Sequence, residues 1–314
     1  MSRIDEIDIV EVLRQKDRRS VARLISALEN REEGAIDIIR KIYAMTGKAW
    51  IIGVTGPAGV GKSTLINGMI DEFRKSGKTV GIIAVDPTSP FTGGAILADR
   101  IRMQLHSVDE GVFIRSMATR GHLGGLSPAT SDVVDLLDAF GKDVIIIETV
   151  GVGQDEVDII KIAHSIAVIL MPGMGDEVQT MKAGLMEIAD IFVINKAERE
   201  GSDRLQAELE MVLGLASDMI EWKPRIIRTV ASKKMGIDVL LDALYEHREY
   251  IKASEQFKEK RHHAIRQRLF DAYQDLTLAR AMSKLQDVEF NEIINDIYER
   301  KLDPYTAAEK LFFK

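Results

Sequence analysis

Eight residues from Gly56 to Ser63 have the composition and spacing of a phosphate-binding loop. Glycines let successive backbone N–H groups turn toward one anion, and the N-terminus of a following helix adds a favourable dipole. Lys62 would contact the β- and γ-phosphates of a nucleoside triphosphate, and the Ser63 hydroxyl would bind Mg²⁺. The stretch matches G-x-x-x-x-G-K-[ST] and consists of Gly56, Pro57, Ala58, Gly59, Val60, Gly61, Lys62 and Ser63, with Thr64 next in the chain.

The segments on either side of this loop decide whether it is a phosphate site or a chance glycine-rich turn. The preceding WIIGVT (50–55) is predicted to be a buried strand. The apolar residues after the loop have helical spacing: Leu65, Ile66, Met69, Ile70 and Phe73. Strand, loop and helix in this order are the context that a P-loop requires, so we prefer the phosphate-binding interpretation.

Three acidic residues are candidates for the metal that accompanies a triphosphate. Asp86 closes the apolar run TVGIIAVD, Glu148 closes VIIIE, and Asp99 lies in GGAILADRIRM. Hard oxygen ligands suit Mg²⁺. Each acid alone could be a helix cap or a surface charge. Together, at predicted strand ends, they favour metal binding or ordering of water, with Ser63 as a fourth ligand.

A second motif is suited to reading a nucleotide base. VINKAE ends a predicted strand with Asn195, Lys196 and Glu198, and it is similar to the N-K-x-D motif of GTPases. There the acid accepts hydrogen bonds from guanine N1 and N2, a pattern that adenine does not offer. Glu198 is one methylene longer than Asp, so reduced selectivity remains an alternative. The stretch TVAS (229–232), which includes Ala231, fits a loop whose backbone amide meets guanine O6.

The elements that must position these motifs alternate along the chain. Predicted strands are apolar on both faces, which indicates a parallel sheet covered on both sides. We therefore expect an α/β fold: a mostly parallel P-loop NTPase sheet with helices on both faces, flanked by helical N- and C-terminal extensions. Ligands of such sheets bind beyond the carboxyl ends of the strands. The predicted strands are 50–55, 79–85, 112–116, 144–149, 166–171, 191–195 and 225–230.

The expected organisation is an N-terminal helical extension (1–47), a nucleotide-binding domain (48–254) and a C-terminal helical arm (255–314). The arm carries an apolar stripe at helical spacing. By its pattern alone, this stripe could pack back on its own domain or pair with a second copy. The stripe consists of Ile265, Leu269, Phe270, Tyr273, Leu276 and Ala279.

Composition excludes several classes of protein. A net charge of −7 disfavours a general nucleic-acid binder. The chain has no cysteine, which removes disulfides, thiolate metal sites and cysteine nucleophiles. Its apolar runs are too short to cross a membrane, and its first twenty residues lack the pattern of a secretory signal. We therefore expect a cytoplasmic protein with no membrane or nucleic-acid partner.

Three further motifs carry a resemblance to a known family. VDPTSPFTGGAILADRIRM, RGHLGGLSPAT and ETVGVGQDEVDI, in this order, are similar to those of the MeaB/ArgK-type GTPases, which are associated with methylmalonyl-CoA mutase. The resemblance covers nearly the whole chain. It implies a homodimeric GTPase that binds GTP or GDP with Mg²⁺ through Ser63, Asp86, Asp99 and Glu148. It also implies that the C-terminal helices form the dimer arm.

The same resemblance implies a partner and a signalling segment. The partner would be an adenosylcobalamin-dependent acyl-CoA mutase, whose cofactor loading and protection the GTPase gates. MPGMGDEVQTMK is similar to the segment that signals to the mutase, and Lys182 matches its nucleotide-responsive lysine. Together with Lys62, Asp86 and Glu148, Lys182 completes the set expected to act in hydrolysis.

Hydrolysis is expected to be slow without a partner. In Ras-like enzymes a glutamine follows the glycine of the second switch segment, whereas here Val152 follows Gly151. Gln154 could order the attacking water only after a rearrangement, or it could simply be a polar residue at the start of a helix.

Two other functions remain alternatives. A phosphotransferase linked to amino-acid transport would need a base for a substrate hydroxyl, and none stands out. A nickel-insertion GTPase would need histidine or cysteine clusters, whereas the chain has 6 scattered histidines.

Overall fold

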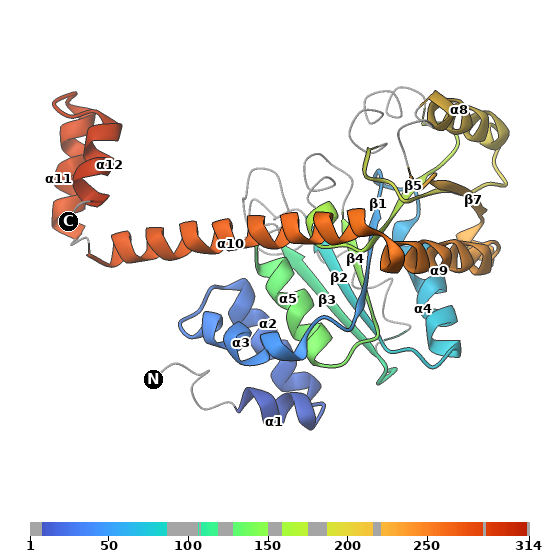
Figure 1. Ribbon diagram of the computed structural model, residues 1–314, viewed down its shortest axis with the longest axis horizontal. Helices are drawn as coiled ribbons and strands as arrows, with labels where there is room; N and C mark the ends of the chain where they lie inside the picture. Colours follow the sequence, from blue (N-terminus) through green and yellow to red (C-terminus); the bar gives the residue numbers. More distant parts are fainter. Residues whose placement is uncertain are drawn as a thin grey trace. The chain divides into compact units, whose positions relative to one another are not determined.

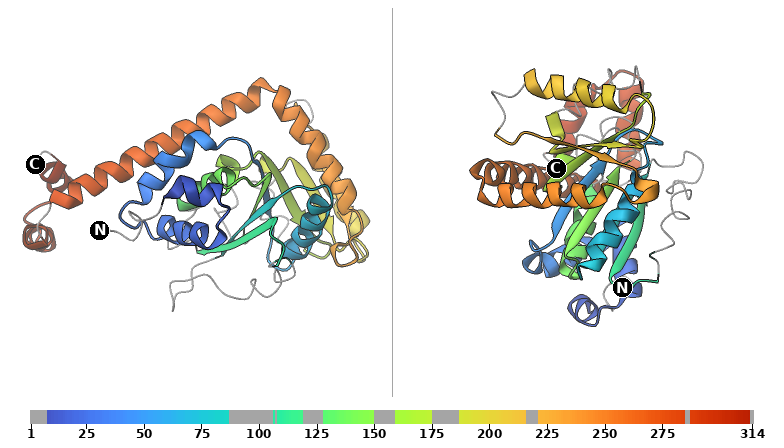
Figure 2. Two further views of the ribbon diagram at one scale, coloured as in Figure 1. Left: turned by 90° about the horizontal axis from the view of Figure 1, so that it is seen from below. Right: turned by 90° about the vertical axis from the view of Figure 1, so that its right-hand side faces the viewer.

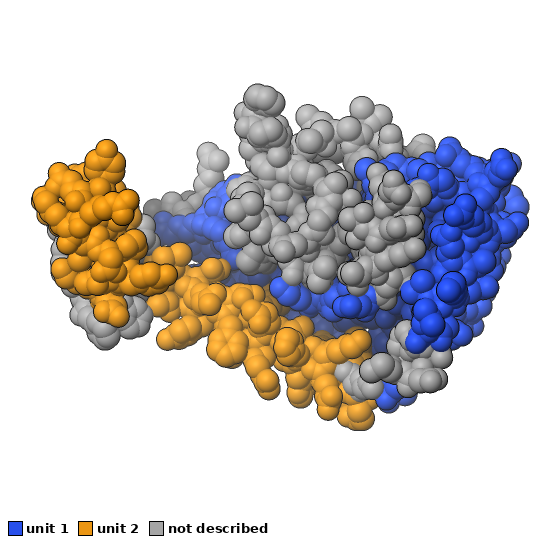
Figure 3. Space-filling view, turned by 90° about the horizontal axis from the view of Figure 1, so that it is seen from above, with its two compact units in different colours: residues 1–254 blue, residues 255–314 orange. Residues whose placement is uncertain are grey.

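The computed structural model describes residues 8–86, 106, 108–118, 128–149, 159–174, 187–215, 221–284 and 287–312. The chain divides into two compact units, residues 1–254 and 255–314, which are coloured separately in Figure 3. The first unit contains the sheet and the second is helical. Among the described residues, no helix combines the length and the apolar character needed to cross a membrane.

The first unit is built on a seven-stranded sheet in which every paired strand runs parallel to its neighbour (Figure 1). Their order is β3-β2-β4-β1-β5-β6-β7, which confirms the expected fold class. The strands are β1 (Trp50–Thr55), β2 (Val80–Asp86), β3 (Val112–Ala118), β4 (Val144–Thr149), β5 (Ser165–Leu170), β6 (Ile191–Asn195) and β7 (Arg225–Thr229).

Helices cover both faces of this sheet. On one face, β-strand side chains share a core with α1 (Ile9–Arg14), α2 (Arg18–Glu29), α3 (Ala35–Ile42), α5 (Pro128–Ala139) and α8 (Ser202–Leu215). On the other, they pack against α4 (Lys62–Lys75) and α9 (Ile237–Ala253). The left view of Figure 2 shows α1–α3 and the α4–α9 pair on opposite sides of the sheet. Short 3₁₀ turns complete the unit at Tyr43–Met45, Ile159–Lys161 and Ala231–Lys233.

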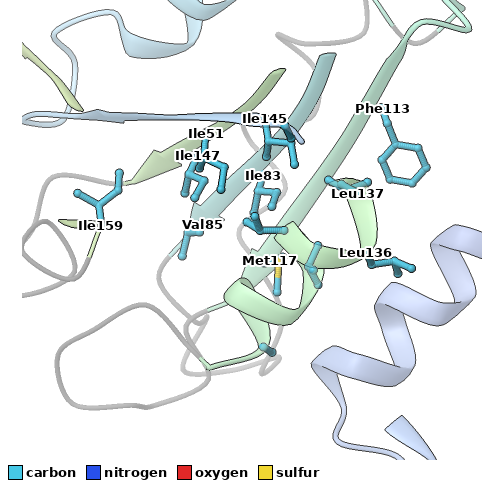
Figure 4. Packing of buried hydrophobic residues seen from close by; sticks show 14 of the residues in the cluster. Ile51, Ile83, Val85, Phe113, Met117, Leu136, Leu137, Ile145, Ile147 and Ile159 are labelled. Atoms are coloured by element: carbon cyan, nitrogen blue, oxygen red, sulfur yellow. The ribbon is translucent and has the colours of Figure 1, made fainter. Parts of the chain in front are cut away.

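The alternation of strand side chains produces these two cores. Ile51 of β1 faces the core that contains α5, whereas Ile52 faces the core that contains α4. Figure 4 shows the first core: residues of β1 to β4, among them Ile83, converge on Leu136 and Leu137 of α5. Because both faces are covered, the central strands β1, β4, β5 and β6 are buried along their whole length, whereas the edge strand β7 has an exposed Arg228.

Residues 8–45 are integrated into the first core. Buried side chains of α2 and α3 contact α5, so the N-terminal helices form part of the layer that covers the sheet. The second unit contains α10 (Glu255–Lys284), α11 (Asp287–Tyr298) and α12 (Pro304–Phe312). Along α10, side chains at helical spacing are exposed: Ile265, Leu269, Phe270, Tyr273 and Leu276.

Candidate nucleotide-binding site

The glycine-rich loop lies between β1 and α4 and has a backbone that only glycine adopts easily. Gly56, Gly59 and Gly61 have φ values of 139°, 78° and 97°. A Cβ on Gly56 would lie 2.2 Å from the carbonyl oxygen of Ile169, and one on Gly61 would lie 2.5 Å from Asn195 Nδ2. Close packing therefore adds to the conformational requirement at both positions.

Lys62 begins α4 and lies across the loop. Its ammonium donates to the carbonyl oxygens of Gly56 at 2.6 Å and Pro57 at 2.9 Å, and the side chain is buried. A buried cation at a helix N-terminus is an environment that attracts a phosphate group. The structure therefore places the Lys62 ammonium against the loop, and its contact with phosphates stays a prediction.

Sheet topology brings Ser63 and Glu148 together. β1 lies beside β4, and the register pairs Val54 with Glu148, so the end of β4 adjoins the loop that follows β1. The Ser63 hydroxyl donates to Glu148 Oε1 at 2.9 Å, and both side chains are buried. This hydroxyl and carboxylate are hard oxygen donors of the kind that Mg²⁺ takes. They fit two positions of the predicted metal set.

The other predicted metal ligands are described only in part. The backbone of Asp86 ends β2, and β2 pairs with β4, which places Asp86 at the same edge of the sheet. Its side chain and all of Asp99 lie outside the described residues, as do Gln154 and Lys182. Within the ranges that are described, no three acidic or histidine side chains form a cluster.

Asn195, at the end of β6, joins three loops. Its Nδ2 donates to the carbonyl oxygen of Val60 at 2.8 Å, and its Oδ1 accepts from Thr229 Oγ1 and from the Ala231 N–H, each at 3.1 Å. The asparagine thus connects the P-loop to the loop after β7. Pattern reasoning included the stretch 229–232 but missed the partnership of Thr229, because a lone threonine has no distinctive spacing.

Lys196 extends this connection. It has a left-handed backbone, with φ at 55°, and its ammonium donates to the carbonyl oxygen of Gly59 at 2.7 Å. Glu198 is exposed in the loop that follows, whereas Ala231 is buried with its N–H directed at Asn195. The structure therefore brings the predicted phosphate and base motifs together at the carboxyl edge of the sheet.

A pair of threonines supports this edge and was not predicted. Thr149 Oγ1 donates to Thr55 Oγ1 at 2.8 Å, and both residues are buried. The bond links the last residues of β4 and β1, next to Glu148 and Gly56. It fixes the spacing between the P-loop and the strand that carries the candidate metal ligand.

The chain is similar to known proteins over most of its length. A family model described as "Methylmalonyl Co-A mutase-associated GTPase MeaB" matches residues 21–286. A Pyrococcus abyssi protein named as a GTPase is 53% identical and aligns with 98% of this chain and 95% of its own length. GTPase ArgK of Escherichia coli is 35% identical, over 79% of this chain and 78% of its own.

Among solved structures, the fold is similar to that of a LAO/AO transport system kinase. The TM-score is 0.72 at 24% identity, over 99% of this chain and 97% of that one. The family match spans the P-loop, the acidic strand ends and the base motif. The chain is therefore a member of the MeaB family of P-loop GTPases.

Proposed function

We propose that this protein is a Mg²⁺-dependent GTPase that acts as a chaperone of an adenosylcobalamin-dependent acyl-CoA mutase, such as methylmalonyl-CoA mutase. It gates loading of the cofactor and protects the mutase. The proposal rests on the P-loop of this MeaB-family chain. In that loop Ser63 is hydrogen-bonded to Glu148, and Asn195 of the base motif is hydrogen-bonded to the loop carbonyl of Val60. The protein would act in the cytoplasm, with no nucleic-acid or membrane partner.

The phosphate end of the site would work through positioning and charge. Backbone N–H groups of residues 58–64 would surround the phosphates, and the Lys62 ammonium would exchange its two carbonyl contacts for phosphate oxygens. Ser63 and Glu148, with Asp86 and Asp99, would hold Mg²⁺, and Lys182 would respond to the bound nucleotide. The metal would neutralise charge on the phosphates. No protein nucleophile is required, because water attacks the terminal phosphate.

Turnover by the protein alone would be slow. Phosphoryl transfer to water needs an oriented water molecule, and Val152 occupies the position where Ras-like enzymes carry glutamine. A partner that rearranges this segment would supply the missing orientation. The product of the reaction would therefore be a conformational change in the mutase complex.

The proposed assembly is a homodimer formed through α10. Apolar side chains on this helix are strongly exposed, with Leu269 at 69% and Tyr273 at 66%. A helix with such a stripe is stabilised when another apolar surface covers it. The family resemblance favours a second copy of this chain as that surface.

GTP turnover by the purified protein with Mg²⁺, measured with and without the mutase of the same organism, tests the proposal. We expect slow turnover that the mutase accelerates, and no turnover by Lys62→Ala with or without the mutase. Turnover that the mutase leaves unchanged would contradict a partner-gated switch. Transfer of labelled phosphate to another protein would instead support the phosphotransferase alternative.

A further inference from the structure

The backbone that carries the base-reading motif is fixed on both sides of Glu198. Asn195 holds it through the contacts with Val60, Thr229 and Ala231. One residue before Glu198, the Ala197 N–H donates to the carbonyl oxygen of Thr229 at 3.0 Å. One residue after it, the Arg199 N–H donates to the carbonyl oxygen of Lys196 at 3.0 Å and closes a turn around Glu198.

The side chains around this turn add further restraint. The Lys196 ammonium is bound to Gly59 of the P-loop, and Arg228 pairs with Asp203 at 2.6 Å at the start of α8. Arg228 also donates to the carbonyl oxygen of Ala197 at 3.4 Å. These contacts leave the backbone little freedom to retreat, so the extra methylene of Glu198 must be accommodated by its side chain alone.

The longer side chain changes how a carboxylate can meet a base. Relative to aspartate, it adds about 1.5 Å of bond length and one rotatable bond whose freedom is lost on binding. A carboxylate held in register accepts from guanine N1–H and the N2 amino group together. On the longer and less restrained side chain, the N1–H contact can form while the paired N2 contact is weakened.

From this geometry we infer that Glu198 makes the site a reader of 6-oxopurine nucleotides that distinguishes guanine weakly from hypoxanthine. This inference rests on the proposed function of the same site. Hypoxanthine keeps the 6-oxo group and N1–H and lacks only the N2 amino group. Adenine remains excluded, because its N1 is an acceptor and would face the Glu198 carboxylate.

Binding of GDP, IDP and ADP to the full-length protein, measured by calorimetry, tests the inference. The wild type should prefer GDP over IDP by less than about fivefold. In Glu198→Asp this preference should rise by about tenfold, the usual worth of one hydrogen bond to a charged group. Glu200→Asp makes the same change at a neighbouring exposed acid and should leave the preference as in the wild type.

Two results would overturn the inference. One is a wild-type preference for GDP over IDP well above about fivefold, which would show that the longer acid reaches both guanine donors. The other is a Glu198→Asp variant with an unchanged preference. ADP binding equal to GDP binding, or no binding of either 6-oxopurine nucleotide, would contradict the proposed guanine-nucleotide function as well.

Discussion

At the scale of single residues, Gly61 combines two constraints that a side chain would violate. Its φ is 97°, and an added Cβ would lie 2.5 Å from Asn195 Nδ2. We expect Gly61→Ala to displace Asn195 from the P-loop and to lower GDP affinity at least about tenfold. It should also lower the free energy of unfolding by about 2 kcal/mol. Calorimetry and urea denaturation measure the two effects.

Gly77→Ala is the matched control for this variant. Gly77 also has a positive φ, 75°, but nothing lies within 4 Å of an added Cβ. Gly77→Ala should lower the free energy of unfolding by about 1 kcal/mol and leave GDP affinity unchanged. Equal GDP affinity in Gly61→Ala and Gly77→Ala would contradict the role given to the contact between Gly61 and Asn195.

Lys142 provides a pH-dependent prediction away from the site. Burial, and to a smaller extent the nearby charges of Arg18, Lys16 and Arg74, together lower the pKa of Lys142 from 10.5 to about 8. Between these two pKa values the unfolded chain binds more protons than the folded chain, so this group makes stability rise with pH. From pH 7.5 to pH 10 we expect a gain of about 2 kcal/mol from Lys142.

Lys142→Met should lack this gain. Urea denaturation at both pH values, compared between wild type and variant, isolates the contribution of Lys142 because other titrating groups are common to both. Lys41→Met makes the same change at an exposed lysine and should follow the wild-type pH dependence. A wild type and a Lys142→Met variant with parallel pH profiles would refute the expected proton release on folding.

At the scale of elements, Asp138 at the end of α5 holds the segment that leads into β1. Its carboxylate accepts from the N–H groups of Gly47 at 2.5 Å and Ala49 at 3.0 Å, and also from that of Lys48. Asp138→Ala would leave these donors without the carboxylate and should destabilise the protein by about 3 kcal/mol. Thermal unfolding measures this loss.

Asp37→Ala serves as the comparison for Asp138→Ala. Asp37 forms an exposed ion pair with Arg40 on α3, an interaction that contributes less than about 1 kcal/mol. GDP affinity should be retained in both variants, because neither residue contacts the P-loop. A stability loss in Asp138→Ala no larger than that in Asp37→Ala would show that the carboxylate does not anchor β1.

The helices and strands were largely predictable from the sequence, whereas the order in which the strands lie side by side was not. Apolar runs bounded by turn residues indicated the strands, and a glycine pattern between strand and helix indicated the P-loop. The contact between Ser63 and Glu148 depends on β4 lying beside β1, an order that no local pattern encodes. The contact of Thr229 with Asn195 was missed for the same reason, because it depends on the β6–β7 register that pairs the two residues.

At the scale of the whole molecule, the exposed stripe on α10 predicts the assembly state. The proposed homodimer should have twice the 35.0 kDa mass of the chain in light scattering. Leu269→Glu combined with Tyr273→Glu places two charges in the stripe and should give a monomer, because burying unpaired carboxylates is costly. Gln274→Glu adds a charge at an exposed polar position of the same helix and should leave the dimer intact.

A monomeric wild type, or a double variant that remains dimeric, would contradict the proposal that α10 forms the dimer interface. The stripe itself was evident from helical spacing. What covers it was not, because periodicity identifies an apolar face without identifying its partner.

A partner-gated switch requires that the mutase distinguish the GTP-bound from the GDP-bound form of this protein. Its most direct test is the affinity of the adenosylcobalamin-dependent mutase of the same organism for this protein, loaded with Mg²⁺ and either GDP or a non-hydrolysable GTP analogue. A switch can act only through a difference in affinity between its two states. We predict that the two dissociation constants differ by at least about tenfold. Equal affinities in the two nucleotide states would show that the mutase does not respond to the bound nucleotide.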